Sequence, residues 1–437
     1  MTYSSKATEF LDFVSASPTA FHAVEQLSIL LQQHGFRRLD EAAQWALVPG
    51  EKYYVTKNGS AIIAFIIPEN DVTHFQIVSS HADSPMFKLK PRAESPSCKC
   101  YMRLNTEVYG GMIMSTWLDR PLSVAGRLIV KDGTSLYSKL VTLDRDIALI
   151  PNMPIHFNRE INDGYKYNPQ IDLLPLYGDE NDTGVLIEQL AEASQISPDQ
   201  IIGTDLFLFN RMQGSIWGTK KQFISCPRID DLECAFTSFH AFLSLEAASN
   251  DTVPVFAVFD NEEVGSGSKQ GADSTFMTDT FSQIAAQCSS NLPLSAMIAR
   301  SFMLSADNAH AVHPNHPEKY DEQNRVYMNK GVVIKHSANQ KYTTDALSDA
   351  VFSEICNEHN IPVQHFANRS DIRGGSTLGN IANTHASMNT ADIGLAQLAM
   401  HSSYETAGTT DIDYMIQALA AFYQTPVSIS GNGTVTW

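Results

Sequence analysis

The sequence is poor in cysteine and has no recognisable cysteine motif. Only six of its 437 residues are cysteines, and no two of them are spaced as Cys-x-x-Cys. A chain of this length can build a stable core without disulfides, so we expect reduced thiols, as in a cytosolic protein. The six are Cys98, Cys100, Cys226, Cys234, Cys288 and Cys356.

Long apolar runs and an excess of positive charge are also lacking. No stretch approaches the roughly 18 uninterrupted apolar residues that a membrane-spanning helix needs. The N-terminus has no basic patch followed by an apolar segment, so no secretory leader is predicted. Lysines and arginines number 30 against 48 aspartates and glutamates, a net charge of −18. Because phosphates repel such a surface, we expect a soluble, cytoplasmic protein with neither a nucleic-acid nor a membrane partner.

Charged residues are fewer than in an average protein, whereas hydrophobic residues are plentiful. They make up 18% and 43% of the chain, respectively, which predicts a packed core and excludes a largely disordered chain. The length predicts two domains, or one large domain with an insertion.

Hydrophobic periodicity predicts both helices and strands. Apolar residues recur at helical spacing after Ser17-Pro18-Thr19 and stop at Gly35, which predicts the first helix. Nearly continuous apolar strands predict a sheet that is covered on both faces. Further helices are predicted at 185–193, 231–245 and 411–424, and strands at 53–56, 61–67, 73–80, 123–130, 201–209, 253–259 and 296–304.

Residues 92–224 differ from the rest of the chain in their pattern of predicted strands and helices. They contain many short β-like runs between turn residues and a single strong helical pattern. We therefore expect an α/β domain with a mixed sheet, formed by residues 1–91 and 225–437, into which a β-rich domain at 92–224 is inserted.

Metal-binding residue types fall at the ends of the predicted elements. In open α/β sheets, ligands collect beyond the carboxyl ends of the strands, so residues far apart in the chain can share one pocket. Two candidates follow the strand at 73–80, two follow the strand at 253–259, and one follows the strand that ends near 304. The full set is His81, Asp83, Asp230, Glu262, Glu263, Asp307 and His401.

These residue types suit a pair of zinc ions. Zinc accepts imidazole nitrogen and carboxylate oxygen, and two ions about 3.5–4 Å apart need a bridging carboxylate, for which Asp230 is the candidate. His81 and Asp307 would complete the ligands of one ion. Glu263 and His401 would complete those of the other.

Two further carboxylates are predicted to act without binding metal. Glu262 would take a proton from the attacking water and later give it to the leaving amine. Asp83, two residues beyond His81, would orient the imidazole of that histidine.

Simpler explanations exist for each motif taken alone. The acidic segment 260–263 could be a solvated turn, and His81 could be a capping or surface histidine. Asp230 and Asp231 could cap a helix, and Asp231 is expected to do so. The histidines at 310, 313 and 316 are expected to form a pocket wall first and to bind metal second.

Taken together, the motifs resemble the aspartyl aminopeptidase family of dinuclear zinc metallopeptidases, in the order of that family and over nearly the whole chain. The matching segments are Ser17-Pro18-Thr19-Ala20-Phe21-His22, Ser80-His81-Ala82-Asp83-Ser84-Pro85, Tyr109-Gly110-Gly111, Trp117-Leu118-Asp119-Arg120-Pro121-Leu122, Pro154-Ile155-His156, Arg228-Ile229-Asp230-Asp231-Leu232, Phe259-Asp260-Asn261-Glu262-Glu263-Val264-Gly265-Ser266, Asp307-Asn308-Ala309-His310-Ala311-Val312-His313-Pro314-Asn315, Gly375-Ser376-Thr377, Met400-His401-Ser402 and Glu405.

The resemblance implies a zinc-peptidase catalytic domain and an inserted β-rich domain used in assembly, with dimers that build into a dodecamer. It implies the roles given above for the five metal ligands, with Glu262 as general base and Asp83 as a catalytic aspartate. His156 matches a histidine delivered into a neighbouring subunit's site. Lys335 matches a lysine that meets the acidic side chain of the substrate. Tyr342, Gly375 and Ser376 match segments that line the pocket.

The implied activity is hydrolysis of the N-terminal residue, preferably Asp or Glu, from peptides with a free N-terminus. Two Zn²⁺ per subunit would serve it, with Co²⁺ or Mn²⁺ as substitutes. Alternatives are an aminopeptidase of neutral preference, another two-metal peptidase or deacylase of this fold, or a non-catalytic scaffold. The sequence departs from the usual family pattern at Asp231, Tyr320, Ser337 and Arg373-Gly374.

Overall fold

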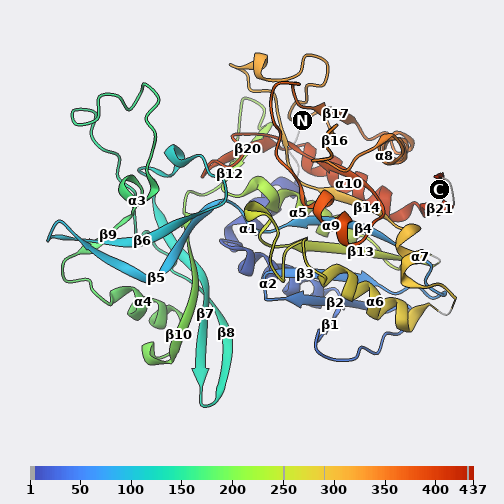
Figure 1. Ribbon diagram of the computed structural model, residues 1–437, viewed down its shortest axis with the longest axis horizontal. Helices are drawn as coiled ribbons and strands as arrows, with labels where there is room; N and C mark the ends of the chain where they lie inside the picture. Colours follow the sequence, from blue (N-terminus) through green and yellow to red (C-terminus); the bar gives the residue numbers. More distant parts are fainter. Residues whose placement is uncertain (1–4, 250, 290, 431–432) are drawn as a thin grey trace.

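A nine-stranded mixed sheet forms the core of one part of the molecule, on the right in Figure 1. The computed structural model describes residues 5–249, 251–289, 291–430 and 433–437. Four neighbouring strands in the middle of the sheet, β13, β4, β14 and β18, run parallel. In spatial order the strands are β1 (Arg37–Leu39), β2 (Lys52–Lys57), β3 (Ala61–Ile66), β13 (Thr252–Phe259), β4 (His74–His81), β14 (Phe302–Ala306), β18 (Asn389–Gly394), β16 (Val332–His336) and β17 (Val363–Ala367).

Both faces of this sheet are covered by helices, as the apolar strands predicted. In β3, alternate residues join different cores: Ile62 and Ala64 lie in one, Ile63 and Phe65 in the other, because side chains of a strand alternate between faces. The first face carries α1 (Ser5–Ala16), α2 (Ala20–Gln33), α5 (Ile229–Leu243), α8 (Ala346–Glu358) and α10 (Asp411–Gln424). The second carries α6 (Phe276–Cys288), α7 (Leu294–Ala299) and α9 (Leu378–His385).

Two parts of this domain differ from the sequence-based expectation. The predicted strand at 296–304 is wrong in its first half, because helix α7 covers Leu294–Ala299 and β14 begins only at Phe302. A short apolar run fits a buried helix as well as a strand, and periodicity alone does not separate them. Helix α1 was not predicted; it precedes α2 and packs Phe10 and Phe13 against Phe236 of α5.

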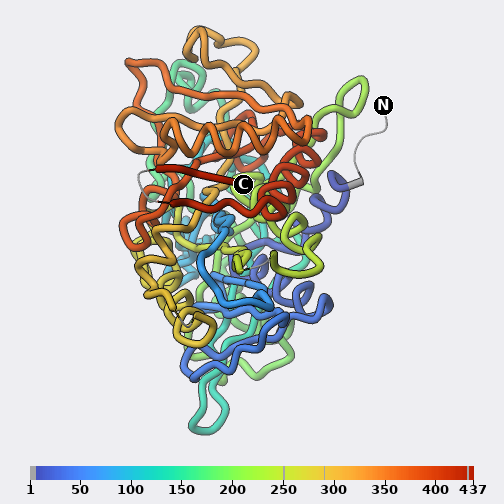
Figure 2. The backbone as a smooth tube through the Cα atoms, turned by 90° about the vertical axis from the view of Figure 1, so that its right-hand side faces the viewer, coloured from blue at the N-terminus to red at the C-terminus, as the bar shows by residue number. Residues whose placement is uncertain are grey.

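A second, antiparallel sheet lies to one side of the first (Figure 1). It has its own apolar core, to which Leu186 and Leu190 of helix α4 (Val185–Ser194) contribute. Its long β7–β8 hairpin projects beyond the rest of the molecule (Figure 2). In spatial order its strands are β8 (Ser135–Thr142), β7 (Leu122–Asp132), β10 (Ile201–Asn210), β5 (Met86–Ser97), β6 (Tyr101–Tyr109) and β9 (Leu176–Asp179).

A third sheet joins strands from the middle of the chain to strands near its C-terminal end. It pairs β12 with β20 from the C-terminal part of the chain. Its strands are β11 (Ser215–Trp217), β12 (Phe223–Cys226), β20 (Glu405–Gly408), β19 (Ala396–Leu398) and β15 (Ala309–His310). The division of the chain at residues 92 and 224 stays a prediction; β5 itself begins at Met86.

The remaining elements are short. They are α3 (Pro169–Asp172), the 3-10 turns η1 (Met114–Trp117), η2 (Pro198–Gln200), η3 (Glu262–Val264) and η4 (Pro317–Lys319), and the hairpin of β21 (Ser428–Ser430) with β22 (Thr434–Thr436). Within the described residues, no helix has both the length and the apolar character needed to cross a membrane.

Candidate metal centre

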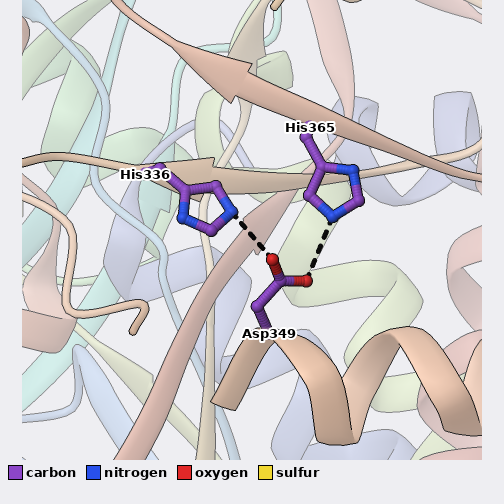
Figure 3. Close-up of side chains that lie close together, drawn as sticks. All are labelled: His336, Asp349 and His365. Atoms are coloured by element: carbon purple, nitrogen blue, oxygen red, sulfur yellow. Dashed lines mark hydrogen bonds and ion pairs between the residues drawn. The ribbon is translucent and has the colours of Figure 1, made fainter. Parts of the chain in front are cut away.

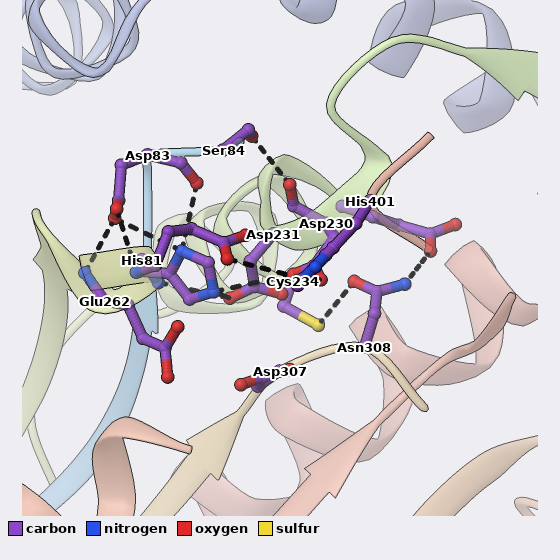
Figure 4. Close-up of polar contacts among 12 residues, drawn as sticks. His81, Asp83, Ser84, Asp230, Asp231, Cys234, Glu262, Asp307, Asn308 and His401 are labelled. Atoms are coloured by element: carbon purple, nitrogen blue, oxygen red, sulfur yellow. Dashed lines mark hydrogen bonds and ion pairs between the residues drawn. The ribbon is translucent and has the colours of Figure 1, made fainter. Parts of the chain in front are cut away.

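Residues from five separate segments meet at the carboxyl end of the central parallel strands (Figure 4). His81 is the last residue of β4, and Asp307 directly follows β14. Glu263 lies in turn η3 after β13, Asp230 lies at the start of α5, and His401 lies between β19 and β20. The structure thus brings together all five residues that the sequence suggested as metal ligands.

The Asp230 carboxylate lies between the two imidazoles. Its Oδ1 is 3.5 Å from His81 Nε2, and its Oδ2 is 3.5 Å from His401 Nε2. Asp307 joins the group around His81, and Glu263 joins the group around His401, with Glu263 Oε2 3.3 Å from His401 Nε2. Asp230 therefore belongs to both ligand groups, as a bridging carboxylate must.

Each imidazole is oriented by a backbone carbonyl on its other nitrogen. His81 Nδ1 is 3.1 Å from the carbonyl oxygen of Asp83, and His401 Nδ1 is 2.9 Å from that of Gly111. Because a carbonyl only accepts hydrogen bonds, both Nδ1 atoms donate. In the neutral tautomer this leaves each Nε2 lone pair directed at Asp230, which is the arrangement of metal-binding histidines.

The charge balance of the site also fits cations. Several carboxylates surround it, among them those of Asp83, Asp230, Asp231, Glu262, Glu263 and Asp307. The facing basic side chains are His81, His401 and Lys335. Asp230 Oδ1 and Glu263 Oε1 are buried without a hydrogen-bond partner, and buried carboxylates need cations or donors. The donor set of imidazoles and carboxylates is the one that zinc accepts.

The ionisation of these groups follows from their proximity. Burial lowers the pKa of His401, but Asp230 and Glu263 outweigh it and raise that pKa to about 10. Burial likewise opposes charge on His81, and Asp231, Asp230 and Asp83 raise its pKa well above the usual value. For Asp230, the nearby imidazoles of His401 and His81 overcome burial and hold the carboxyl pKa below its usual range. Bound cations would take over this role, because a nearby cation favours the charged carboxylate.

Glu262 lies beside the ligands and is not one of them. It belongs to neither metal-binding group, and Figure 4 shows its carboxyl group extending toward the side of the site that carries Asp307. Burial, reinforced by Asp307, Asp83 and Asp230 against the opposing effect of His81, raises the pKa of Glu262 to about 8. A carboxyl group with a pKa near neutrality can both accept and return a proton.

Asp83 fixes the turn that carries the two glutamates. Its Oδ1 accepts the backbone N–H of Glu262 and its Oδ2 that of Glu263, each at 3.1 Å. The Tyr109 hydroxyl donates to the same Oδ2 at 2.7 Å and accepts from Asn261. Asp83 Oδ1 is also 3.4 Å from His81 Nδ1. The Asp83 carboxylate therefore connects the turn to the histidine.

The expected capping role of Asp231 is wrong. The N-cap position of α5 is Arg228, and Asp231 Oδ1 is buried without a hydrogen-bond partner. Asp231 Oδ2 instead accepts the backbone N–H of His81 at 3.1 Å. The cap motif describes only local sequence, whereas the N–H group that Asp231 binds comes from β4 across the site.

Sequence reasoning assigned no role to three residues that support the ligands. Glu405 accepts the backbone N–H groups of Asp230 (3.0 Å) and His401 (2.7 Å). Gly110 has a φ of +75°, and a Cβ there would come within 3.1 Å of Glu263 Cβ, so glycine is required. Tyr109 is the third. The only sequence signal for these three residues was that they lie in segments that match the family pattern, Tyr109-Gly110-Gly111 and Glu405.

Lys335 is buried at the site, with 2% of its surface exposed. Lys335 is therefore not a surface lysine. Its Nζ donates to the carbonyl oxygens of Asp307 (2.7 Å) and Asn308 (3.3 Å) and is 3.4 Å from Asp307 Oδ1. The buried Tyr342 ring lies 5.2 Å from the same ammonium group. Lys335 and Tyr342 thus border the ligand group around His81.

Other expected site residues lie apart from the ligands within this chain. His156 is exposed in the loop that follows β8. Gly375 and Ser376 are exposed before α9, where the Ser376 hydroxyl donates to Asn380. Among the described residues, the metal-binding groups do not include His310, His313 or His316. His310 is half-buried, and its pKa is lowered to about 4, chiefly by burial and then by Lys335.

Comparison with known families gives a match over most of the chain. The family described as "Aminopeptidase I zinc metalloprotease (M18)" matches residues 13–423. A "Probable M18 family aminopeptidase 2" of Clostridium novyi (strain NT) is 44% identical over 428 residues, which is 95% of this chain and 98% of the relative. One from Ectopseudomonas mendocina (strain ymp) is 38% identical over 424 residues, 95% of this chain and 97% of the relative.

Solved structures show the same fold. The structure described as "Cryo-EM structure of the Ape4 and Nbr1 complex" has a TM-score of 0.93 at 35% identity, covering 97% of this chain and 88% of that one. The "Structure of S. cerevesiae mApe1 dodecamer" has a TM-score of 0.85 at 27% identity, covering 96% of both chains.

Proposed function

Because the chain belongs to the aminopeptidase I family of zinc metalloproteases (M18), we propose that it removes N-terminal residues, preferably Asp or Glu, from peptides at a two-zinc site. The observation that carries the proposal is the position of Asp230. Its two carboxylate oxygens face two separate histidines, each of which has a further carboxylate beside it. This is the arrangement that a pair of ions about 3.5–4 Å apart requires.

The proposed ligands divide into two sets that share Asp230. His81 and Asp307 would hold one Zn²⁺, and Glu263 and His401 the other, with Co²⁺ or Mn²⁺ as substitutes because these ions accept the same donors. When bound, the ions lower the pKa of water and polarise the carbonyl group of the substrate.

Glu262 is the proposed general base and acid. It would take a proton from the attacking water and pass it to the leaving amine. The turn that carries the Glu262 side chain is fixed, because Asp83 accepts the backbone N–H groups of both Glu262 and Glu263. With the turn held in this way, neighbouring side chains can point differently, one toward the ions and the other toward the substrate.

The preference for acidic residues rests on Lys335. A buried ammonium group favours a carboxylate and is left poorly paired when an apolar side chain enters. The longest of its three contacts, 3.4 Å to Asp307 Oδ1, is the one that a substrate carboxylate would replace once Asp307 binds an ion. Tyr342, Gly375 and Ser376 are proposed to line the same pocket.

Assembly is proposed to complete the site. We place His156 in the active site of a neighbouring subunit, within a homo-oligomer of dimers that form a dodecamer. The exposed position of His156 and the similarity to a dodecameric structure support this arrangement. The compartment is proposed to be the cytoplasm.

The test is a rate survey combined with metal analysis. The p-nitroanilides of Asp, Glu and Leu are compared for the wild type and for Lys335→Met, with zinc content measured on the same samples. We expect Lys335→Met to lower kcat/KM for Asp and Glu by about 10²-fold or more and that for Leu much less, because one buried ion pair is lost.

Two outcomes would contradict parts of the proposal. Equal losses on Asp, Glu and Leu substrates would remove the specificity role of Lys335 and leave a neutral preference as the better description. Hydrolysis of N-acetylated peptides at a rate similar to that of free peptides would point to a different two-metal hydrolase.

A further inference from the structure

Three side chains that could bind a metal ion meet at the edge of the nine-stranded sheet formed by β16 and β17, apart from the proposed catalytic centre (Figure 3). His336 ends β16, His365 lies in the edge strand β17, and Asp349 lies in the first part of α8. His336 Nε2 is 3.2 Å from Asp349 Oδ2, and His365 Nε2 is 3.0 Å from Asp349 Oδ1.

Strand register explains why the two histidines share a face. Ile334 pairs with His365 in the parallel ladder, and His336 lies two residues after Ile334. Because side chains alternate along a strand, both imidazoles lie on the face of the sheet that packs Ile334 against α8. The same alternation turns Lys335 to the opposite face, where it contacts Asp307.

We propose that His336, Asp349 and His365 bind a divalent cation of the zinc class that ties α8 to the sheet edge. Ligand atoms around a tetrahedral zinc lie roughly 3.3–3.5 Å apart, close to the distances between the two imidazoles and the carboxylate. Two imidazole nitrogens and one carboxylate oxygen are donors that zinc and its neighbours in the periodic table accept. Water would fill the open position.

The cluster is accessible and partly preorganised. The side chains of His336, His365 and Asp349 are 33%, 44% and 21% exposed, respectively, so an ion can enter from solvent. The Ser353 hydroxyl, one turn along α8, donates to Asp349 Oδ1 at 2.8 Å and so holds the carboxylate in place, as partners of metal ligands commonly do. The competing explanation is a pair of histidine–aspartate ion pairs without metal.

Zinc content of full-length variants separates these explanations. The wild type, His365→Gln and Asp349→Asn are equilibrated with buffered Zn²⁺, and bound zinc is counted per chain. We expect both variants to hold about one zinc ion fewer than the wild type. His359→Gln is the matched control, because His359 follows the other end of α8 and its Nδ1 lies 2.9 Å from the carbonyl oxygen of Ile355; it should keep the wild-type count.

Thermal unfolding and activity complete the test. Added Zn²⁺ should raise the Tm of the wild type and His359→Gln more than that of His365→Gln. The peptidase rate of His365→Gln should match that of the wild type, which shows that the lost ion is not catalytic. Equal zinc counts and equal Tm shifts in the wild type, His365→Gln and Asp349→Asn would overturn the proposal and leave ion pairs alone.

Discussion

At the scale of single residues, the backbone of turn η3 decides how two adjacent glutamates differ. The Asp83 carboxylate binds the N–H groups of both Glu262 and Glu263, yet only Glu263 joins a metal-binding group. Their environments differ accordingly, because Glu263 faces His401 and Asp230. One fixed turn thus places two adjacent residues of one type in separate environments.

Replacing Glu262 with Gln should abolish most activity without disturbing metal binding. The amide keeps the shape of the side chain but cannot accept the proton, so kcat should fall by about 10²–10⁴-fold while zinc content and Tm stay at wild-type values. Steady-state kinetics and metal analysis of the same sample measure this. Glu263→Gln provides the contrast, since it should lose zinc as well as activity.

At the scale of elements, His22 connects helix α2 to the β7–β8 hairpin of the second sheet. Its Nδ1 is 2.8 Å from Thr19 Oγ1, and its Nε2 is 3.0 Å from Thr142 Oγ1. Burial, and secondarily Arg228, lowers the pKa of His22 to about 4. The folded protein therefore favours the neutral imidazole at this position.

This lowered pKa predicts a loss of stability in mild acid. Below pH about 6.5 the unfolded chain protonates His22 while the folded protein does not, so the free energy of unfolding should fall between pH about 6.5 and about 4. His22 can contribute at most about 1.4 kcal/mol per pH unit to the slope of the free energy of unfolding against pH. Urea unfolding of His22→Gln should show a shallower pH slope than the wild type, whereas His34→Gln, at the exposed end of α2, should keep the wild-type slope.

At the scale of the whole molecule, the loop after β8 exposes apolar side chains around His156. Phe157 is 84% exposed, Met153 57% and Ile155 46%. Apolar groups of this size gathered on one loop indicate a protein contact. They match the proposal that His156 reaches a neighbouring subunit.

Replacing Phe157 with Asp should weaken both assembly and activity. A charge placed in the proposed contact must be desolvated on association, so the assembly should dissociate into smaller species, and kcat should fall with it. Light scattering coupled to size-exclusion chromatography and kinetics at several protein concentrations measure this. Val48→Asp, at an exposed position of a different loop, is the control. A fully active monomer would disprove the shared site.

The sequence by itself determined the α/β class, the covered sheet and the candidate ligands. Strand β13 is nearly all apolar and β4 is buried along its whole length, and His81 ends β4 whereas Glu263 lies in the turn after β13. Because parallel strands end at the same edge, residues at these positions converge when the strands are neighbours, as β13, β4 and β14 are. The family motifs then gave roles to these positions.

Only the tertiary structure decided which groups support the ligands. Asp231 binds the N–H of His81, and Glu405 binds those of Asp230 and His401; nothing in their local sequence indicates such partners. The cluster of His336, Asp349 and His365 likewise depends on strand register and on the packing of α8. Periodicity reports which way a side chain faces within its own element, whereas these contacts depend on how distant elements are placed in space.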